Sequence, residues 1–191
     1  MKKGLLVILS GPSGVGKGTV RKKVMEDKSL NLVYSISMTT RLPRNREVEG
    51  EDYYFVTQEQ FQEHLDKGNL LEYCEFVGNR YGTPKDKVEQ LREEGKNVFL
   101  EIEVNGANQV LSKVKDKGVI SIFLMPPSLK TLEDRIRKRK SEPDEIIKER
   151  LNKGRSEIKL KSNYEYVVTN DRVDEAAAKI SKIIKERMNQ L

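Results

Sequence analysis

The feature that most constrains the fold is a glycine-rich segment near the start of the chain. Gly11 to Lys17 matches the pattern G-x-x-x-x-G-K, and the apolar run Leu5 to Leu9 comes directly before it. A short continuous apolar run predicts a strand buried on both faces of a parallel sheet. The segment from Thr19 to Met25 then predicts the opening of a helix. The chain is therefore expected to be an α/β protein whose first strand leads through a tight loop into a helix.

This loop has the composition of a phosphate-binding loop. Its glycines let successive backbone N–H groups converge on one anion, the helix N-terminus adds positive potential, and Lys17 supplies a mobile charge. An ordinary glycine-rich turn is the alternative, and the buried strand and helix on either side disfavour it. Lys17 is followed by Gly18, whereas the usual loop has a Ser or Thr there that contacts Mg²⁺. Thr19 comes one residue late, which argues against assuming that the loop binds the metal directly.

The content of cysteine and histidine limits which disulfides and metal sites the chain can form. The 191 residues include one cysteine, Cys74, and one histidine, His64. An internal disulfide and a metal site built from His and Cys ligands are thereby excluded. No apolar run approaches the roughly 20 residues of a membrane span, and no signal-peptide pattern precedes the first strand. We therefore expect a cytoplasmic protein that does not bind a membrane.

The positive charge is concentrated in one segment. Residues 128–161 hold 12 Lys and Arg against 7 Asp and Glu, which accounts for +5 of the net charge of +6. The segment has no aromatic residue, so a platform for stacking nucleic-acid bases is not predicted. A basic patch beside a phosphate loop is more simply explained by a polyanionic nucleotide.

The order of the predicted elements indicates a parallel sheet wrapped by helices. Strands are predicted at residues 5–9, 32–37, 53–56, 70–77, 81–83, 97–102, 119–124 and 166–168. Helices are predicted at residues 57–67, 83–95, 107–115, 129–140, 143–161 and 173–188, with Thr57 and Gln60 as a capping box and Thr83 as the N-cap before Pro84. The strand-rich block at 34–81 interrupts the alternation of strands and helices, and it is predicted to be inserted.

Three groups of residues are candidates for binding a ligand, since ligands bind beyond the carboxyl ends of strands in such sheets. The first is the proline-broken turn after Ser37. Its two arginines, Arg41 and Arg44, can converge on one phosphate and bind it with bidentate guanidinium groups. The hydroxyl groups of Tyr53 and Tyr81 can donate to the same oxygens. For the arginines alone, a solvated basic turn is the competing interpretation.

The second group is acidic and consists of Glu72, Glu101 and Glu103. Acids within apolar strands are costly unless they have partners. A carboxylate can accept two parallel hydrogen bonds from the ring N–H and the exocyclic amine of guanine, and adenine offers no such pair of donors. A mismatched base would leave the acid unpaired, at a cost of about 1–3 kcal/mol. Glu75 is interpreted as a solvated edge residue.

The third group is the basic helical pair. Arg135 and Arg139 are four residues apart and share a helix face, while Arg150 and Arg155 belong to the second helix. Surface arginines that only solvate a helix are the alternative.

Taken together, these residues resemble guanylate kinase of the bacterial, single-domain type over nearly the whole chain. The matching segments are Gly11–Thr19, Ser37–Arg44, Glu47–Tyr53, Glu72, Tyr81–Thr83, Leu100–Glu103 and Asn170-Asp171, with the arginines of the helical pair. The resemblance implies a P-loop nucleoside monophosphate kinase that transfers the γ-phosphoryl group of Mg·ATP to GMP, and to dGMP, directly and in line. It also implies a core (1–33, 96–127 and 162–191), a GMP-binding region (34–95) whose last helix returns to the core, and a lid (128–161).

The resemblance also implies a role for each matching residue. ATP would be bound by Gly11, Pro12, Ser13, Gly14, Val15, Gly16, Lys17, Gly18 and Thr19, with Asn170 near the adenine. The GMP phosphate would be bound by Ser37, Arg41, Arg44, Tyr53 and Tyr81, and the guanine by Glu72, Thr83 and Glu101. The catalytic residues would be Lys17, Arg41, Arg135, Arg139 and Arg150, with Arg155 a weaker candidate. Thr19 is a candidate metal contact, as is Glu103 through a water; many relatives have Asp at the position of Glu103.

Three other functions compete with this interpretation. A catalytically inactive guanylate-kinase-like module would bind phosphopeptides, but such modules typically lose the ATP loop and the lid arginines. A kinase for AMP or dTMP would lack the acids expected to bind guanine. A basic RNA-binding protein would show a recognisable motif, and none is present. The sequence makes no prediction about oligomeric state.

Overall fold

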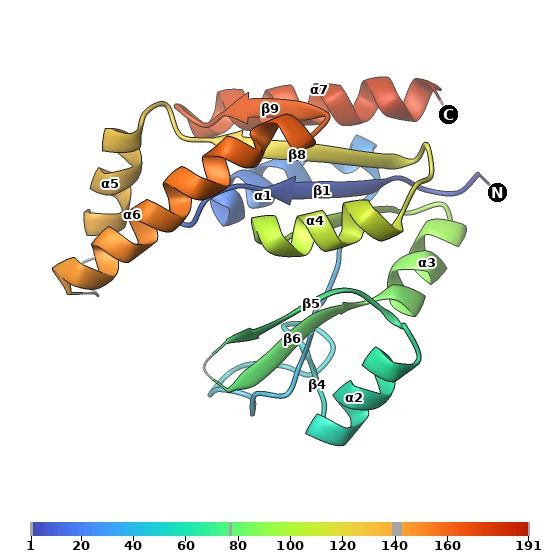
Figure 1. The fold of residues 1–191 in the computed structure, drawn as a ribbon. Helices are drawn as coiled ribbons and strands as arrows, with labels where there is room; N and C mark the ends of the chain where they lie inside the picture. The colour runs from blue at the N-terminus through green and yellow to red at the C-terminus, as the bar shows by residue number, and fades with distance from the viewer. Residues whose placement is uncertain (1, 77, 139–142, 191) are drawn as a thin grey trace.

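The computed structural model describes residues 2–76, 78–138 and 143–190 (Figure 1). Its larger sheet has five parallel strands in the order β2-β7-β1-β8-β9. These strands are β1 (Leu6–Ser10), β2 (Leu32–Tyr34), β7 (Asn97–Glu101), β8 (Val119–Met125) and β9 (Tyr166–Thr169). The predicted α/β architecture with a parallel sheet is confirmed.

The first strand divides the core into two layers. Leu5, Val7 and Leu9 face one cluster of buried apolar residues, while Leu6 and Ile8 face the other. All five are at most 1% exposed, as expected for a strand covered on both faces. The first cluster includes residues of α1 (Lys17–Met25), α5 (Leu129–Lys138), α6 (Asp144–Ile158) and α7 (Val173–Gln190). The second includes residues of α3 (Lys85–Glu93) and α4 (Val104–Lys113).

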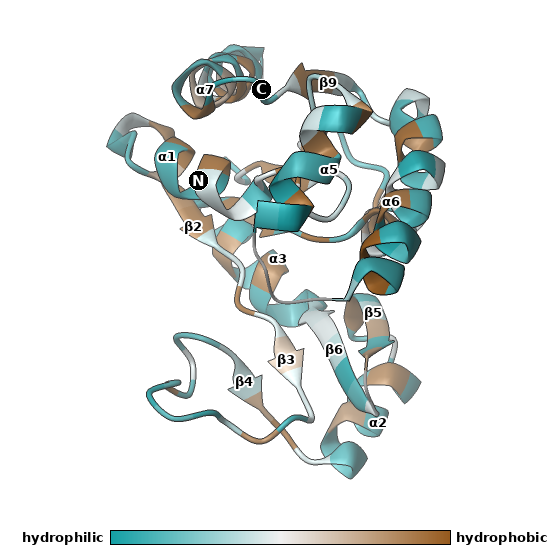
Figure 2. Cartoon of the chain, turned by 90° about the vertical axis from the view of Figure 1, so that its left-hand side faces the viewer, coloured by the Kyte–Doolittle hydropathy of each residue, from teal (hydrophilic) through white to brown (hydrophobic). Residues whose placement is uncertain are grey.

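The helical pair α5 and α6 lies beyond the carboxyl end of β1 (Figure 1). In Figure 2, α6 alternates between hydrophilic and hydrophobic along its turns, which is typical of a helix with one buried side. Ile147 and Leu151 bury that side against the core. This packing holds α6 beside the carboxyl end of β1 (Figure 1).

A smaller, mixed sheet in the order β4-β3-β6-β5 lies apart from the larger one (Figure 1). Its strands are β3 (Met38–Thr39), β4 (Tyr54–Phe55), β5 (Leu70–Phe76) and β6 (Asn79–Pro84), and α2 (Gln58–Asp66) packs beside it. Met38, Phe61 and Leu70 form its small core. The predicted capping box of α2 is confirmed by reciprocal hydrogen bonds between Thr57 and Gln60.

The structure corrects several predicted boundaries. The strand predicted at 32–37 ends at Tyr34, and Met38–Thr39, predicted to be part of a turn, pairs with β4 and β6. Thr83 does not cap a helix, because it lies in β6 and α3 begins at Lys85. α1 begins at Lys17, two residues earlier than predicted, and α6 gives way to a 3₁₀ turn after Ile158. Of the break predicted at residues 141–144, the first two residues lie outside the described residues, and α6 begins at Asp144 after Pro143.

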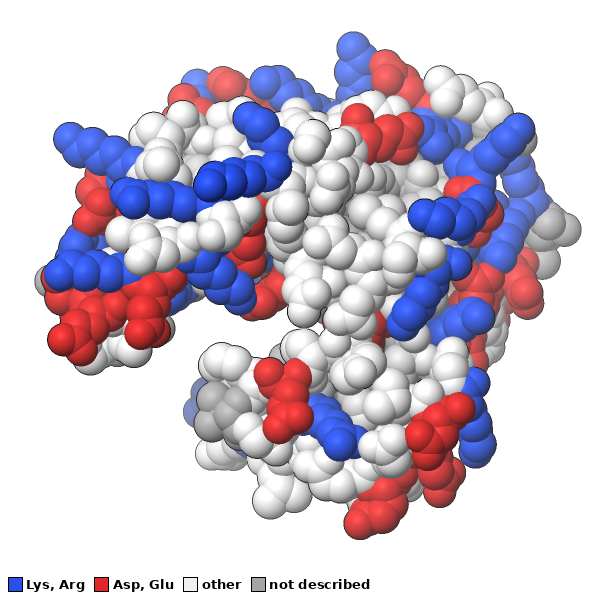
Figure 3. All heavy atoms as spheres, in the orientation of Figure 1, with Lys and Arg blue, Asp and Glu red and all other residues white. Residues whose placement is uncertain are grey.

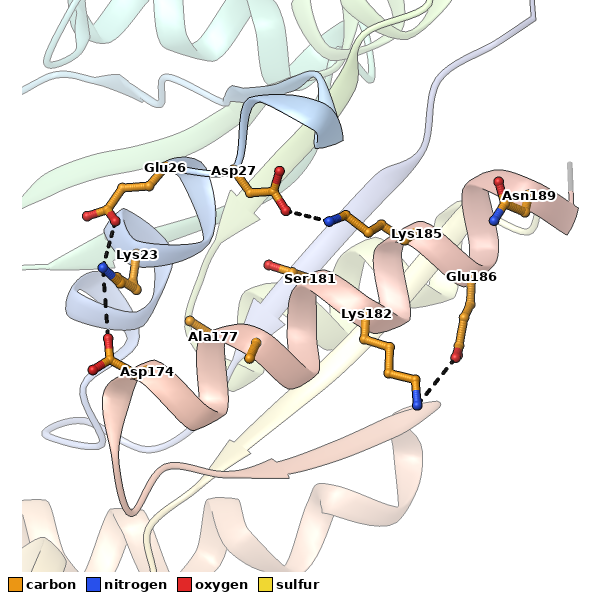
Figure 4. Close-up of a pocket in the computed structure, with 11 residues that line it drawn as sticks. Lys23, Glu26, Asp27, Asp174, Ala177, Ser181, Lys182, Lys185, Glu186 and Asn189 are labelled. Carbon is orange, nitrogen blue, oxygen red and sulfur yellow. Dashed lines mark hydrogen bonds and ion pairs between the residues drawn. The ribbon is translucent and has the colours of Figure 1, made fainter.

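Helix α7 packs against the first helix in the same apolar cluster, and ion pairs join the two at their exposed side (Figure 4). Lys23 of α1 lies 3.8 Å from Asp174, and Asp27, just after α1, lies 2.8 Å from Lys185. Between the two helices is a groove of about 610 Å³ that includes Ala177. Within the described ranges, no helix combines the length and apolar character needed to cross a membrane.

Candidate functional site

The phosphate loop joins the end of β1 to the start of α1. The geometry requires glycine at Gly11 and at Gly16, whose φ angles are 152° and 97°. A Cβ atom at Gly16 would lie 2.7 Å from the Asn170 side chain. The Lys17 ammonium donates to the carbonyl oxygens of Gly11 (2.7 Å) and Pro12 (3.3 Å), so its side chain folds back over the loop. Burial lowers the pKa of Lys17, although neighbouring carboxylates oppose this.

Three of the predicted residues surround this loop. Asn170 donates from Nδ2 to the carbonyl oxygen of Val15 at 2.9 Å, and Arg135 donates to the carbonyl oxygen of Asn170 at 2.9 Å. Arg150 of α6 donates to Ser13 Oγ at 2.6 Å. These contacts hold the middle of the loop, at Ser13 and Val15, and bring two guanidinium groups to it. Arg139 lies outside the described residues, and Arg155 and Thr19 are exposed.

A second cavity, of about 670 Å³, lies between the larger and the smaller sheet. At its wall Thr83 Oγ1 donates to the buried Glu72 carboxylate at 2.6 Å. Burial raises the pKa of Glu72, and the hydrogen bond from Thr83 partly counters this. A Cβ atom at Gly106 would lie 2.8 Å from Glu72 Oε2, so only glycine leaves this oxygen room. Of the other residues predicted to bind GMP, the cavity is lined by Ser37, Tyr53, Tyr81 and Glu101.

The two cavities share a wall. The cavity beside the phosphate loop has a volume of about 740 Å³ and is lined by Lys17 and Thr19, and both cavities are bordered by Glu101 and Glu103. The register of the sheet explains this, because Glu101 at the end of β7 pairs with Leu9 at the end of β1. Two ligands bound in these cavities would therefore meet at the carboxyl ends of adjacent strands.

Glu101 is also attached to the first helix. Its Oε2 accepts a hydrogen bond from Arg21 Nε at 2.7 Å, and the Arg21 guanidinium lies 4.0 Å from the centre of the Tyr34 ring. A Cβ atom at Gly18 would lie 3.5 Å from Glu101 Oε1. Glu101 thus lies between the loop and the second cavity rather than beside Thr83. Its predicted contact with guanine stays a prediction.

The two arginines of the proline-broken turn do not converge on one partner through their guanidinium groups. Arg41 donates to both carboxylate oxygens of Glu47, at 2.8 and 3.0 Å, and the same carboxylate accepts the backbone N–H of Arg44 at 2.7 Å. The Arg41 guanidinium also lies 5.4 Å from the centre of the Tyr53 ring. Hydrogen bonds from Arg41 lower the pKa of Glu47. Glu47 therefore occupies the bidentate position on Arg41 that a phosphate could take.

Four residues of this site had no predicted role, although their spacing in the sequence carried a signal. Arg21 follows Lys17 by four residues on α1, and Glu47 follows Arg44 by three. Lys153 and Glu157 follow Arg150 by three and seven residues on α6, so all three share one helix face. The missed residues are Arg21, Glu47, Lys153 and Glu157.

The oxygen donors beside the loop suit a magnesium ion that arrives with a nucleotide. Thr19, Glu101 and Glu103 line the loop cavity, and hydroxyl and carboxylate oxygens are the ligands that Mg²⁺ prefers. Mg²⁺ is usually held by one or two carboxylates plus substrate phosphates and water. No cluster of three or more His, Cys, Asp or Glu suited to a metal ion occurs in the part of the chain that the structure describes. The donor set therefore fits a metal shared with phosphates.

Figure 3 shows the molecule hollowed between the part that carries α5 and α6 and the part that carries the smaller sheet. Lys and Arg side chains gather on the upper part beside this hollow, with acidic side chains among them. Such an arrangement attracts a polyanion while it also offers carboxylates to a base or a metal.

Comparisons with known proteins agree with this geometry. The guanylate kinase family model matches residues 3–187. Guanylate kinases of Mycoplasma capricolum and Lactococcus lactis are each 53% identical over 184 residues, or 96% of this chain. The chain spans 61% of the first relative's length and 88% of the second's. The crystal structure of guanylate kinase from Anaplasma phagocytophilum has a TM-score of 0.73 and 34% identity, covering 97% of this chain and 86% of its own. The chain belongs to the guanylate kinase family.

Proposed function

We propose that the protein transfers the γ-phosphoryl group of ATP to GMP, and to dGMP, in a reversible reaction. The observation that supports this most directly is the wall of Glu101 and Glu103, which borders both the cavity of the phosphate loop and the cavity of Glu72. A donor bound at the loop and an acceptor bound beside Glu72 would meet there. The names of the relatives add independent support.

The acceptor cavity is suited to guanine. The Glu72 carboxylate has two oxygens, and one already accepts from Thr83 while Oε2 faces Gly106. Guanine offers the two neighbouring donors that such a carboxylate can bind, and adenine offers none on that edge. We assign the phosphate of GMP to Ser37, Tyr53, Tyr81 and the arginines of the turn, with Arg41 exchanging Glu47 for phosphate. Residues 34–95 would then form the GMP-binding region.

Phosphoryl transfer needs no covalent intermediate here, because the GMP phosphate is itself a nucleophile. Catalysis would come from alignment and from neutralising the charge that spreads over the transferred group. Lys17 and the loop amides would hold the ATP phosphates, and Arg135 and Arg150 would approach from residues 128–161, the proposed lid. Mg²⁺ bound with ATP would add charge neutralisation, beside Thr19, Glu101 and Glu103. Closure of the lid would exclude water, which would otherwise hydrolyse ATP.

A coupled assay of ADP release tests this proposal. With Mg·ATP we expect turnover with GMP and dGMP and almost none with AMP or dTMP. Lys17→Ala should lower kcat by about 10²–10³-fold, because it removes a charge aimed at the phosphates, while GMP still binds. Lys179→Ala changes an exposed lysine of α7 and serves as the control. An absence of turnover with GMP would contradict the proposed reaction, and a Lys17→Ala variant of normal activity would contradict the role of the loop.

A further inference from the structure

The inner part of α6 carries a row of three charged side chains, and the reaction proposed above uses only the first of them, Arg150. Arg150, Lys153 and Glu157 follow one another at helical spacing on one face. Arg150 contacts the phosphate loop through Ser13, and Lys153 Nζ lies 3.0 Å from Glu103 Oε2. One face of this helix therefore contacts both the loop and the wall of the acceptor cavity.

Glu157 is the buried member of the row. It is 9% exposed, and its Oε1 lies 3.8 Å from Lys153 Nζ. Its Oε2 is buried and has no hydrogen-bond partner within the described residues, and the same holds for Tyr164 Oη and Ser10 Oγ. Burial raises the pKa of Glu157, and the charges of Lys153 and Lys17 act against this. Glu157 is therefore a buried carboxylate whose charged neighbour on the same helix is Lys153.

These residues form a chain of alternating charge between the two cavities. Arg150 contacts the loop at Ser13, Glu157 lies beside Lys153 on the same helix, and Lys153 pairs with Glu103 in the shared wall. Lys153 and Glu103 are each more than half exposed, so their ion pair contributes little stability by itself. Its importance lies in its position, because Lys153 comes from α6 and Glu103 from the core.

The helix also contacts the loop directly. A Cβ atom at Gly154 would lie 3.5 Å from Pro12 Cβ, so α6 lies closely against the start of the loop. Movement of α6 therefore changes the surroundings of Lys17 and of Glu103 together.

We propose that Glu157 and Lys153 are positioning residues that couple the ATP site to the GMP site. The proposal rests on the function proposed above. Phosphates at the loop attract the Arg150 guanidinium of α6, which already contacts the loop at Ser13, and a ligand in the acceptor cavity changes the charge that Lys153 meets at Glu103. Each substrate thus shifts α6 toward the position that the other substrate needs. Because such coupling is reciprocal, GMP should tighten the binding of ATP as much as ATP tightens the binding of GMP.

Calorimetry with the whole protein measures this coupling. The affinity for Mg·AMP-PNP, which is not hydrolysed, is determined with and without saturating GMP, and the ratio of the two is the coupling factor. We expect Glu157→Gln and Lys153→Met each to lower this factor by about three- to thirty-fold, and the double variant to lower it no further. Lys148→Met changes an exposed lysine of α6 that pairs with Asp144, and it should leave the factor unchanged.

Two results would overturn the proposal: a coupling factor of one in the unaltered protein, or an unchanged factor in Glu157→Gln and Lys153→Met. A merely structural role would lower the melting temperature and leave the factor intact. If Glu157→Gln does not fold, Lys153→Met decides alone, because its side chain is 57% exposed. Failure of the proposed function gives a different result, in which GMP or AMP-PNP alone does not bind the unaltered protein.

Discussion

Replacing Glu72 with Gln separates the function of this carboxylate from its effect on stability. Gln keeps the size of the side chain and one oxygen for Thr83, but it puts the N–H donors of an amide where guanine needs a hydrogen-bond acceptor. The change removes a hydrogen bond to a charged group, worth about 1.5–3 kcal/mol, and leaves a buried donor unpaired at a further cost of about 1–3 kcal/mol. A loss of about 3–4 kcal/mol predicts a decrease in kcat/KM for GMP of about 10²–10³-fold.

The same substitution is expected to leave the fold intact or stabilise it. Burial raises the pKa of Glu72 in the folded state, so the folded protein binds this proton more tightly than the unfolded chain. The associated stability is present below the unfolded pKa and is lost as the pH rises through the folded pKa. At pH 7 the buried charge is therefore unfavourable, and Gln removes it. The melting temperature of Glu72→Gln at pH 7 should equal or exceed that of the unaltered protein.

The assay combines coupled ADP release at varied GMP with scanning calorimetry at pH 7. Glu93→Gln is the control, since Glu93 is exposed at the end of α3 and lines neither cavity. A Glu72→Gln variant whose kcat/KM stays within about three-fold of the unaltered protein would contradict the assigned role of Glu72. A loss of activity that occurs only together with a lower melting temperature would also contradict this role, because Glu72 would then stabilise the fold without binding guanine.

Two further predictions concern glycines and pH. Gly106→Ala should raise KM for GMP, since its Cβ would lie 2.8 Å from Glu72, whereas Gly18→Ala makes only ordinary contacts and should alter steady-state kinetics little. Equal effects of the two substitutions would contradict this. Hydrogen bonds, first from Lys185, lower the pKa of Asp27 to about 2. Asp27→Asn should therefore lower the melting temperature above about pH 4, and the difference should vanish as the pH falls through 2; a difference independent of pH would count against the pair.

The phosphate loop and the buried first strand could be predicted because their signals are local. An apolar run of five residues, a glycine pattern and a lysine lie within one short stretch, and no distant contact is needed to interpret them. The capping box of α2 is local in the same way. Thr83 illustrates the opposite case. Its position before Pro84 is typical of a helix N-terminus, but pairing between β5 and β6 keeps Thr83 in a strand, where its hydroxyl meets Glu72.

The charged partners could not be predicted for a related reason. Arg41 and Arg44 have the spacing of a phosphate clamp, and the sequence alone does not show that Glu47 folds back onto Arg41. Lys153 and Glu103 are 50 residues apart and come together only through the packing of α6 beside the larger sheet. A sequence pattern indicates which residues suit phosphate. It does not indicate which carboxylates pair with them in the folded chain.

The division between rigid and movable parts has a consequence for the kinetics. Glu101 and the phosphate loop lie at the ends of adjacent parallel strands in fixed register, so the distance between the two cavities is set by the core of the larger sheet. The arginines instead come from outside that core. Arg41 and Arg44 belong to the turn after β3, and Arg135 and Arg150 belong to α5 and α6. Changes in the shared wall should therefore alter alignment and lower kcat, because alignment is realised in the transition state. Changes in the turn, such as Arg41→Ala, should mainly weaken the capture of GMP, which calorimetry would detect as a loss of affinity.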